Sequence, residues 1–371
     1  MQATETSPLP TASALAAWLR LEQTDGVGLI TAHDLLARFS TPEAIFQAGD
    51  DALRAVVKPA RARALLAPPC ASLAAQVDAV QAWRAQPGNL LLTWDHPDYP
   101  ALLRQIAAAP LMLYVKGNPA LLHRLSVAMV GSRNASLMGM QNAERMARAL
   151  SDAGVTIVSG LALGIDAAAH AGGLAGAGGT VAVIGTGADR IYPASNEALA
   201  RRIAEQGCIV SEYALGTPPL RDNFPRRNRV ISGLARAVLV VEAAARSGSL
   251  ITARLAAAQD RDVYAMPGSV HATLSKGCHR LIRDGAKLVE TAEDVLSELK
   301  MGVDAVATGS HFDDSFVDRV LLAMGDEPIR AETLAAHLQQ PAAELQGQLL
   351  ALELAGLLER LPGGWMQRLR R

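Results

Sequence analysis

The chain alternates short aliphatic runs with alanine-rich helical stretches from about residue 88 to residue 300. Each run is continuously apolar rather than apolar at every second position, which is typical of strands buried on both faces of a parallel sheet. Helices between such strands cover the two faces, so the pattern predicts a doubly wound α/β domain. The predicted strands are residues 126–131, 156–160, 180–185, 208–213, 237–242, 262–268 and 287–290. Residues 91–113 are predicted to be an ordered lead-in to this domain.

A helical domain of the SAM or helix-hairpin-helix type is predicted over residues 11–68. Its spacing Gly26-x-Gly28-x-x-x-Ala32 is the helix-hairpin-helix pattern, in which a tight turn can direct backbone N–H groups at a phosphate. Thr41 is predicted to cap a helix that begins at Pro42. Because no basic cluster surrounds the hairpin, packing or contact with a protein is the favoured alternative to phosphate binding.

A winged helix is predicted over residues 313–371, after a small, polar linker at residues 301–312. The predicted elements are three helices and a hairpin turn, at residues 315–324, 331–337, 342–354 and 362–364. Nine acidic residues against six arginines give this segment a net charge of −3, which disfavours phosphate binding. Contact with a protein is therefore favoured over the alternative, duplex binding through a local patch.

The composition excludes several classes of protein. With 35 Lys and Arg against 36 Asp and Glu, the 371-residue chain has a formal charge of −1, so a nucleic-acid site requires a local basic cluster. The three cysteines form no CxxC pair, which excludes a disulfide framework and a thiolate zinc site and suits a reducing compartment. We find no signal-peptide pattern and no apolar run of about 18 residues, so we expect a soluble, cytoplasmic protein without a membrane span.

Small and hydroxyl residues follow the predicted strands at several points. Ligands of parallel sheets bind beyond the carboxyl ends of the strands, where such residues allow a close approach to backbone N–H groups. For each glycine alone the alternative is an ordinary strand-to-helix turn, but the joint occurrence at one edge favours a phosphate-binding rim. The candidate residues at these strand ends are Gly131, Ser132, Arg133, Ser159, Gly160, Ser247, Gly248 and Ser249.

A basic cluster follows the fourth predicted strand. Between residues 221 and 254 seven arginines stand against two acidic residues, a local charge of +5 in a nearly neutral chain. Arginine suits phosphate contact, and an aromatic ring offers a platform for a base. A solvated helix face is the alternative, which the position and the scarcity of acids disfavour. The candidate binding residues are Phe224, Arg226, Arg227, Asn228 and Arg229.

Signatures of common enzymes are missing from the sequence. We find no GxxxxGK[ST], GxSxG, HExxH or kinase set. Asp166 and His170, four residues apart, could form an acid–base pair, but we favour a cap by Asp166 and a local hydrogen bond by His170. Glu212 and Glu242 end strands near the arginines and are predicted to order those cations, with a catalytic carboxylate as the alternative.

Several long motifs, which occur in order along residues 90–300, are similar to those of the DNA-processing protein A family, also called DprA or Smf. The longer members of that family also have a helical domain before this region and a winged helix after it, as predicted here. The motifs are Gly131-Ser132-Arg133, Ser159-Gly160-x-Ala162-x-Gly164-Ile165-Asp166, Ile191-Tyr192-Pro193, Ser211-Glu212-Tyr213, Phe224-Pro225-x-Arg227-Asn228-Arg229 and Ser247-Gly248-Ser249-Leu250-Ile251-Thr252. The resemblance implies an extended Rossmann-like domain over residues 88–300. It also places Gly131, Ser132, Arg133, the Ser159-Gly160 turn and residues 224–229 on a DNA pocket.

The resemblance further implies a function. Members of the family bind incoming single-stranded DNA during natural transformation, protect it, and load the RecA recombinase while displacing single-strand-binding protein. The resemblance implies a homodimer that needs no nucleotide cofactor, and we predict a mechanism of binding without bond cleavage. If Arg133, Arg226, Arg227 and Arg229 help to hold about four phosphates, the logarithm of the DNA association constant should fall with log[salt] with a slope near −3.

Two other functions compete with this one. Phosphoribohydrolases share the extended fold and cleave nucleoside monophosphates, but their PGGxGT loop is absent from the matching strand end at residues 241–249. A transcription regulator would read duplex DNA through the winged helix. Residues 342–354, the third helix there, contain no Lys or Arg, which argues against that function.

Overall fold

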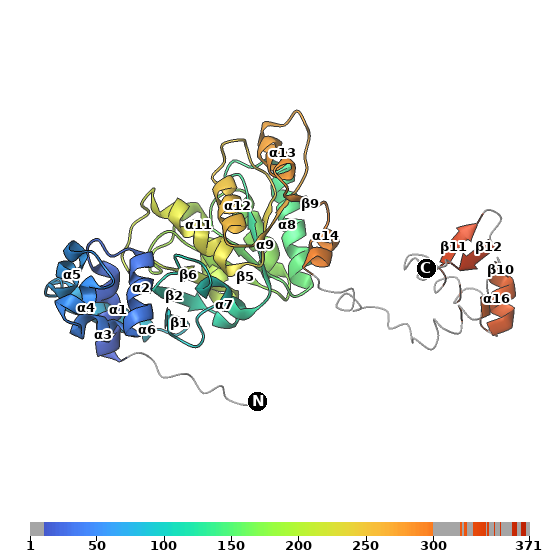
Figure 1. Ribbon diagram of the computed structural model, residues 1–371. Helices are drawn as coiled ribbons and strands as arrows, with labels where there is room; N and C mark the ends of the chain where they lie inside the picture. Colours follow the sequence, from blue (N-terminus) through green and yellow to red (C-terminus); the bar gives the residue numbers. More distant parts are fainter. Residues whose placement is uncertain are drawn as a thin grey trace. The chain divides into compact units, whose positions relative to one another are not determined.

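A nine-stranded sheet is the centre of the first part of the chain, with the strand order β1-β2-β6-β5-β4-β3-β7-β8-β9 (Figure 1). The seven strands from β6 to β9 in this order are parallel to one another. They are β3 (Ser126–Val130), β4 (Thr156–Ser159), β5 (Thr180–Val183), β6 (Cys208–Ser211), β7 (Ala237–Val240), β8 (Asp262–Ala265) and β9 (Lys287–Leu288). All seven predicted strands and the doubly wound fold are therefore confirmed.

The computed structural model describes residues 11–299 and a further set towards the carboxyl terminus. That set is 320, 323–324, 329–338, 340, 345, 349, 358–361 and 365–368. The chain divides into two units, Met1–Gly302 and Val303–Arg371.

Two antiparallel strands extend the sheet beyond the prediction. β1 (Asn89–Thr93) pairs with β2 (Met112–Gly117), and β2 pairs antiparallel with β6. The segment 91–113, which was predicted only as a lead-in, contains most of β1 and the first two residues of β2. Their apolar runs, Leu90–Leu92 and Met112–Val115, carried the signal, but the polar and proline-rich residues between them obscured the pairing.

Helices cover both faces of the parallel strands. Ala128 and Val130 of β3 pack in one core cluster, whereas Val127 and Met129 of the same strand pack in another, because alternate side chains of a strand point to opposite faces. The first cluster includes residues of α11 and α12 and the second includes residues of α8 and α9. The helices that follow β3 are α8 (Leu137–Asp152), α9 (Ile165–Ala175), α10 (Glu197–Gln206), α11 (Asn223–Leu234), α12 (Ser249–Ala258), α13 (Lys276–Arg283) and α14 (Ala292–Glu298).

Six helices precede the sheet and pack on its antiparallel extension (Figure 1). They are α1 (Ala12–Gln23), α2 (Leu29–Phe39), α3 (Pro42–Gln47), α4 (Asp50–Arg54), α5 (Pro59–Leu66) and α6 (Leu73–Arg84). Thr41 caps α3, as predicted, since its Oγ1 accepts a hydrogen bond from the Ala44 N–H at 3.2 Å. The core of these helices includes Met112 and Tyr114 of β2, so helices and sheet form one unit. The predicted limits of the first two domains, 11–68 and 88–300, stay a prediction.

Shorter helical turns complete the first unit. They are α7 (Ala101–Arg104), η1 (Pro119–His123), η2 (Ala194–Asn196) and η3 (Thr273–Ser275). None of the helices within the described ranges has both the length and the apolar character needed to cross a bilayer.

The second unit contains a three-stranded antiparallel sheet and a helix, which belong to the predicted winged helix. Its described elements are β10 (Ile329–Arg330), α16 (Ala331–Leu338), β11 (Leu358–Leu361) and β12 (Trp365–Arg368), and β12 is the central strand. Leu334, Leu345 and Met366 are buried in its core. The predicted linker 301–312 and turn 362–364 lie outside the described residues, as does most of the helices predicted at 315–324 and 342–354.

Candidate functional site

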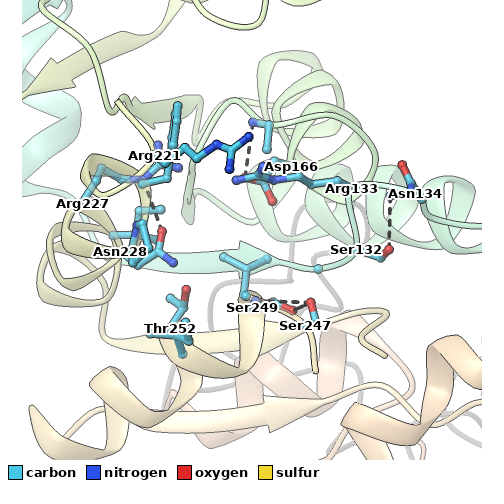
Figure 2. A pocket seen from close by; sticks show the side chains of 18 residues that line it. Ser132, Arg133, Asn134, Asp166, Arg221, Arg227, Asn228, Ser247, Ser249 and Thr252 are labelled. Carbon is cyan, nitrogen blue, oxygen red and sulfur yellow. Dashed lines mark hydrogen bonds between the residues drawn. The ribbon is translucent and has the colours of Figure 1, made fainter. Parts of the chain in front are cut away.

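A cavity of about 460 Å³ opens where the order of the parallel strands reverses. β3 lies between β4 and β7, and ligands of doubly wound sheets bind in the crevice beyond the carboxyl ends at such a point. Figure 2 shows that one wall carries Arg133, Arg221 and Arg227, and the facing wall carries Ser249 and Thr252. The site therefore combines cations from two loops and from α11 with hydroxyl groups from the start of α12.

Most of the predicted site residues line this cavity, although they come from segments far apart in the sequence. Those residues are Gly131, Ser132, Arg133, Phe224, Arg227, Asn228, Ser247, Gly248 and Ser249. Gly160 lines a second, smaller cavity that adjoins the first. Ser159 is fully buried, and its hydroxyl donates to the Met129 carbonyl at 2.7 Å, so it supports the strands rather than a ligand.

Arg226 and Arg229 do not line the cavity. The Arg229 guanidinium forms a two-point ion pair with Glu212, with Nη1–Oε1 and Nη2–Oε2 distances of 2.6 and 2.5 Å. Its Nε donates to the Ala108 carbonyl at 2.9 Å. Most of the Arg229 N–H donors are thus used within the protein, which argues against the expectation that this arginine holds a phosphate. The prediction that Glu212 orders an arginine is confirmed.

Arg227 lines the cavity but is only 3% exposed. Its Nη1 donates to the carbonyls of Gly160, at 2.8 Å, and of Val183, which joins the ends of β4 and β5. Burial lowers the Arg227 pKa to about 10, against the charge of nearby Asp166, so the guanidinium is still charged at neutral pH. Arg227 thus holds the cavity wall and gives it a positive charge.

Gly160 is required by this arrangement. A Cβ atom there would lie 2.7 Å from Nη2 of Arg227 and 2.8 Å from Oδ2 of Asp166. Those contacts are too close for any side chain, so the β4 end has to be glycine for the arginine and the aspartate to stand as they do.

Asp166 and His170 organise the turn between β4 and α9. Asp166 Oδ2 accepts from the N–H groups of Gly160 and Ala162 at 3.1 and 3.4 Å. His170 Nε2 accepts from the Leu161 N–H at 3.2 Å, which leaves the proton on Nδ1, 2.7 Å from the Thr180 hydroxyl. Burial lowers the His170 pKa to about 3. The favoured structural interpretation is confirmed, and an acid–base pair has no place in this geometry.

Glu242 caps a helix instead of ordering an arginine, so that prediction is wrong. Its carboxylate accepts from the Ser136 N–H at 2.9 Å and from the Ser136 hydroxyl at 2.6 Å, at the beginning of α8. An acidic group is favourable at a helix amino terminus. Asp166 likewise occupies the backbone N–H of Gly160, which was expected to face a phosphate.

Phe224 lies at the boundary between the two cavities and lines both. Its ring packs against Gly185, where a Cβ atom would lie 2.9 Å from the ring. The Tyr192 ring is 5.5 Å away between centroids, and the Arg133 Cζ is 5.6 Å from the Phe224 centroid. A half-buried ring between an exposed tyrosine and a cation fits the predicted platform for a base.

Comparison with known proteins gives the family. The sequence model of DNA recombination-mediator protein A matches residues 90–300, and that of the DprA winged helix domain matches residues 313–364. The chain belongs to the DprA family. The chain is 42% identical over 299 residues to Protein Smf of Escherichia coli, which covers 78% of this chain and 80% of that protein. It is 49% identical over 202 residues to DNA processing protein DprA of Streptococcus pneumoniae, over 54% and 71% of the two chains.

Two solved DprA structures are similar to this one. The crystal structure of DprA from Streptococcus pneumoniae has a TM-score of 0.66 and 37% identity, covering 78% of this chain and 99% of that one. A structure of DprA from Helicobacter pylori, described as showing its single-stranded DNA binding mode, has a TM-score of 0.53 and 29% identity, covering 57% and 96%. The resemblance to DprA and the predicted fold class are confirmed.

Sequence reasoning missed several residues that line the cavity of this DprA chain. Asn134, Arg221 and Thr252 are among them. Thr252 lies three residues after Ser249 on α12, so both occupy one face of that helix. Arg221 was part of the basic cluster. Without the position of α11, the sequence could not show that Arg221 lines the cavity whereas other arginines of the cluster do not.

Proposed function

We propose that this chain binds single-stranded DNA in the cavity beyond β3, protects the strand, and delivers it to RecA during natural transformation and recombination. The observation that carries the proposal is a large cavity lined by Arg133, Arg221 and Arg227 at the strand-order switch of a DprA sheet. The Helicobacter pylori relative, whose structure is described as binding single-stranded DNA, supports the same ligand. A homodimer in the cytoplasm, displacement of single-strand-binding protein and the lack of a nucleotide cofactor belong to this proposal.

Binding without bond cleavage is the second part of the proposal. Asp166 is the acidic residue among those that line the cavity, and its carboxylate accepts two backbone hydrogen bonds beside the Arg227 cation. Glu242 is held by Ser136. Neither carboxylate is placed as a free base or nucleophile, which favours a binding protein over a phosphoribohydrolase. Within the described ranges, no group of three or more His, Cys, Asp or Glu could hold a metal ion.

Phosphate binding relies on fewer cations than the sequence suggested. With Arg229 paired to Glu212, three arginines line the cavity. Arg227 is buried and donates to main-chain carbonyls, so Arg133 and Arg221 are the two that remain for direct contact with phosphates. Two phosphate contacts correspond to a slope of the logarithm of the DNA association constant against log[salt] of about −1.4 for a single strand. Ser132, Ser249 and Thr252 add hydroxyl donors.

Fluorescence anisotropy with a labelled oligonucleotide tests the proposal. We expect preference for a single strand over its blunt duplex and a salt slope of about −1.4. Each of the substitutions Arg133→Ala and Arg221→Ala should reduce the magnitude of that slope by about 0.7. Arg148→Ala is the matched control, since Arg148 is an exposed arginine at the other end of α8 from the cavity. A slope near zero, or equal loss in the control, would refute the electrostatic site.

Delivery to RecA needs its own assay. We expect the wild-type chain to accelerate RecA assembly on a strand coated with single-strand-binding protein, measured by the RecA ATPase rate. The Arg133→Ala/Arg221→Ala double variant should lose this acceleration along with its DNA affinity. Tight DNA binding without any effect on RecA would restrict the function to protection of the strand.

A further inference from the structure

Large apolar side chains are exposed along the carboxyl edge of the sheet. Those in the loops and helix starts after the strands are Leu137, Met138, Leu163, Ile191, Tyr192, Leu220, Ile251 and Val270. Elsewhere in the described residues, Ile30, Leu66 and Leu288 are exposed to a similar degree. Single exposed apolar residues are ordinary, but a concentration of them beside one site indicates a contact surface.

Three of these side chains are part of the cavity walls. Ile251, 39% exposed, lines the large cavity. Leu163 and Tyr192, 43% and 45% exposed, line the small cavity of about 60 Å³. The two cavities share Arg133, Ala162, Phe224 and Arg227 among their lining residues, so the apolar surface continues directly from the cationic one.

We propose that Leu163, Tyr192 and Ile251 form an apolar rim that contacts the unpaired bases of the strand whose phosphates the arginines bind. This inference rests on the proposed function and adds to it the residues that select a single strand. A nucleotide joins a charged phosphate to a flat, largely apolar base, and the site places arginines beside apolar walls in the same way. The Tyr192 ring, tilted by 37° from the Phe224 ring, continues the aromatic surface outward.

The rim explains strand selection without sequence selection. Bases of a duplex are paired and stacked within the helix, so their faces cannot reach Tyr192 or Leu163. Unpaired bases all have a face that can stack, whatever their identity, so such contacts tolerate any sequence. Since the rim lines the same cavities as Arg133 and Arg227, a strand that fills them touches both kinds of residue, which favours DNA over a protein as the occupant.

An abasic oligonucleotide separates base contacts from phosphate contacts. We would compare oligothymidylate with an abasic deoxyribose phosphate strand of equal length and charge, by anisotropy, for wild type, Tyr192→Ala and Leu163→Ser/Ile251→Ser. Wild type should bind oligothymidylate at least about tenfold more tightly than the abasic strand. Each rim variant should lose about tenfold with oligothymidylate and retain the wild-type affinity for the abasic strand.

Ile30→Ser is the matched control, because Ile30 is 61% exposed on α2 and lines neither cavity. It should change neither affinity, and the thermal midpoints of all variants should match wild type, since the substituted side chains are exposed. Equal wild-type affinities for the two strands would overturn the rim while leaving DNA binding intact, as would rim variants that bind DNA normally. Failure of wild type to bind either strand would overturn the proposed function itself.

Discussion

Arg229 and Glu212 form a two-point ion pair in which both side chains are largely buried, at 14% and 11% exposure. Removing one partner of such a pair leaves the other charge buried and unpaired, at a cost of about 3–5 kcal/mol. Arg229→Ala should therefore lower the free energy of unfolding by that order, measured by urea titration. Arg229→Lys should restore only part of it, because an ammonium cannot form the two parallel hydrogen bonds.

The same variants distinguish a structural arginine from a DNA ligand. Under conditions where Arg229→Ala, which removes the charge, is still folded, its salt slope for DNA binding should equal that of wild type. A slope smaller by about 0.7 with unchanged stability would show that Arg229 contacts a phosphate after all.

Gly160→Ala should disrupt the cavity from within. The added methyl group would lie too close to both Arg227 and Asp166, and forcing extra volume into a packed site costs about 1–3 kcal/mol. We expect lower stability together with weaker binding of single-stranded DNA. Gly248→Ala serves as the stability control, since a Cβ atom at Gly248 meets nothing within 4 Å; equal stability of the two variants would contradict the close packing.

His170 should make the fold sensitive to mild acid. Its pKa is lowered to about 3 in the folded chain, below the ordinary value of 6.5, so between these values the unfolded state binds a proton that the folded state does not. This contribution is fully present above pH 6.5 and is lost as the pH falls. Between pH 7.5 and pH 5 the loss is about 2 kcal/mol.

A His170→Gln variant isolates that contribution, because every other titrating group is shared with wild type. The stability advantage of wild type over the variant should shrink by about 2 kcal/mol between pH 7.5 and pH 5, measured by urea unfolding at both values. A constant difference would mean that His170 titrates alike in the folded and unfolded chains.

Purified protein should release no adenine from AMP. Asp166 and Glu242 are both engaged by hydrogen-bond donors of the chain, so we expect neither to act on a glycosidic bond. Chromatography of the reaction mixture is the measurement. Release that disappears in Asp166→Asn or in Glu242→Gln would identify a catalytic carboxylate and revive the enzymatic alternative.

The sheet could be predicted from the sequence because each parallel strand is a continuous apolar run, such as Thr180–Val183, set between helices. For the site, the sequence indicated which segments contribute to it but not which side chains within each segment face the cavity. In α11, residues Phe224, Arg227, Asn228 and Ile231 follow the helical repeat on the face towards the cavity, which leaves Arg226 and Arg229 on other faces. The sequence does not show that α11 begins at Asn223, so it does not show which of these side chains share a face of the helix.

The sequence also could not predict which residues that lie far apart in the chain would pair. The sequence placed Glu212 and Glu242 alike, each at a strand end near arginines. Only the fold brings Glu212 to Arg229 and Glu242 to Ser136, across 17 and 106 positions of the chain. Charge patterns show that cations and anions are near one sheet edge, but not which donors each carboxylate will take.

The carboxyl groups of Asp166 and Glu242 also affect how well a free nucleotide could bind in the cavity. Rossmann-like proteins that bind nucleotides offer backbone N–H groups at strand ends and helix starts to a ligand's phosphates. In this chain the N–H groups of Gly160, Ala162 and Ser136 already donate to internal carboxyl groups. A free mononucleotide is left with separate side-chain contacts, whereas a polymer gains from several at once. If the cavity binds single-stranded DNA as proposed, we therefore expect free nucleotides to compete with the strand only weakly.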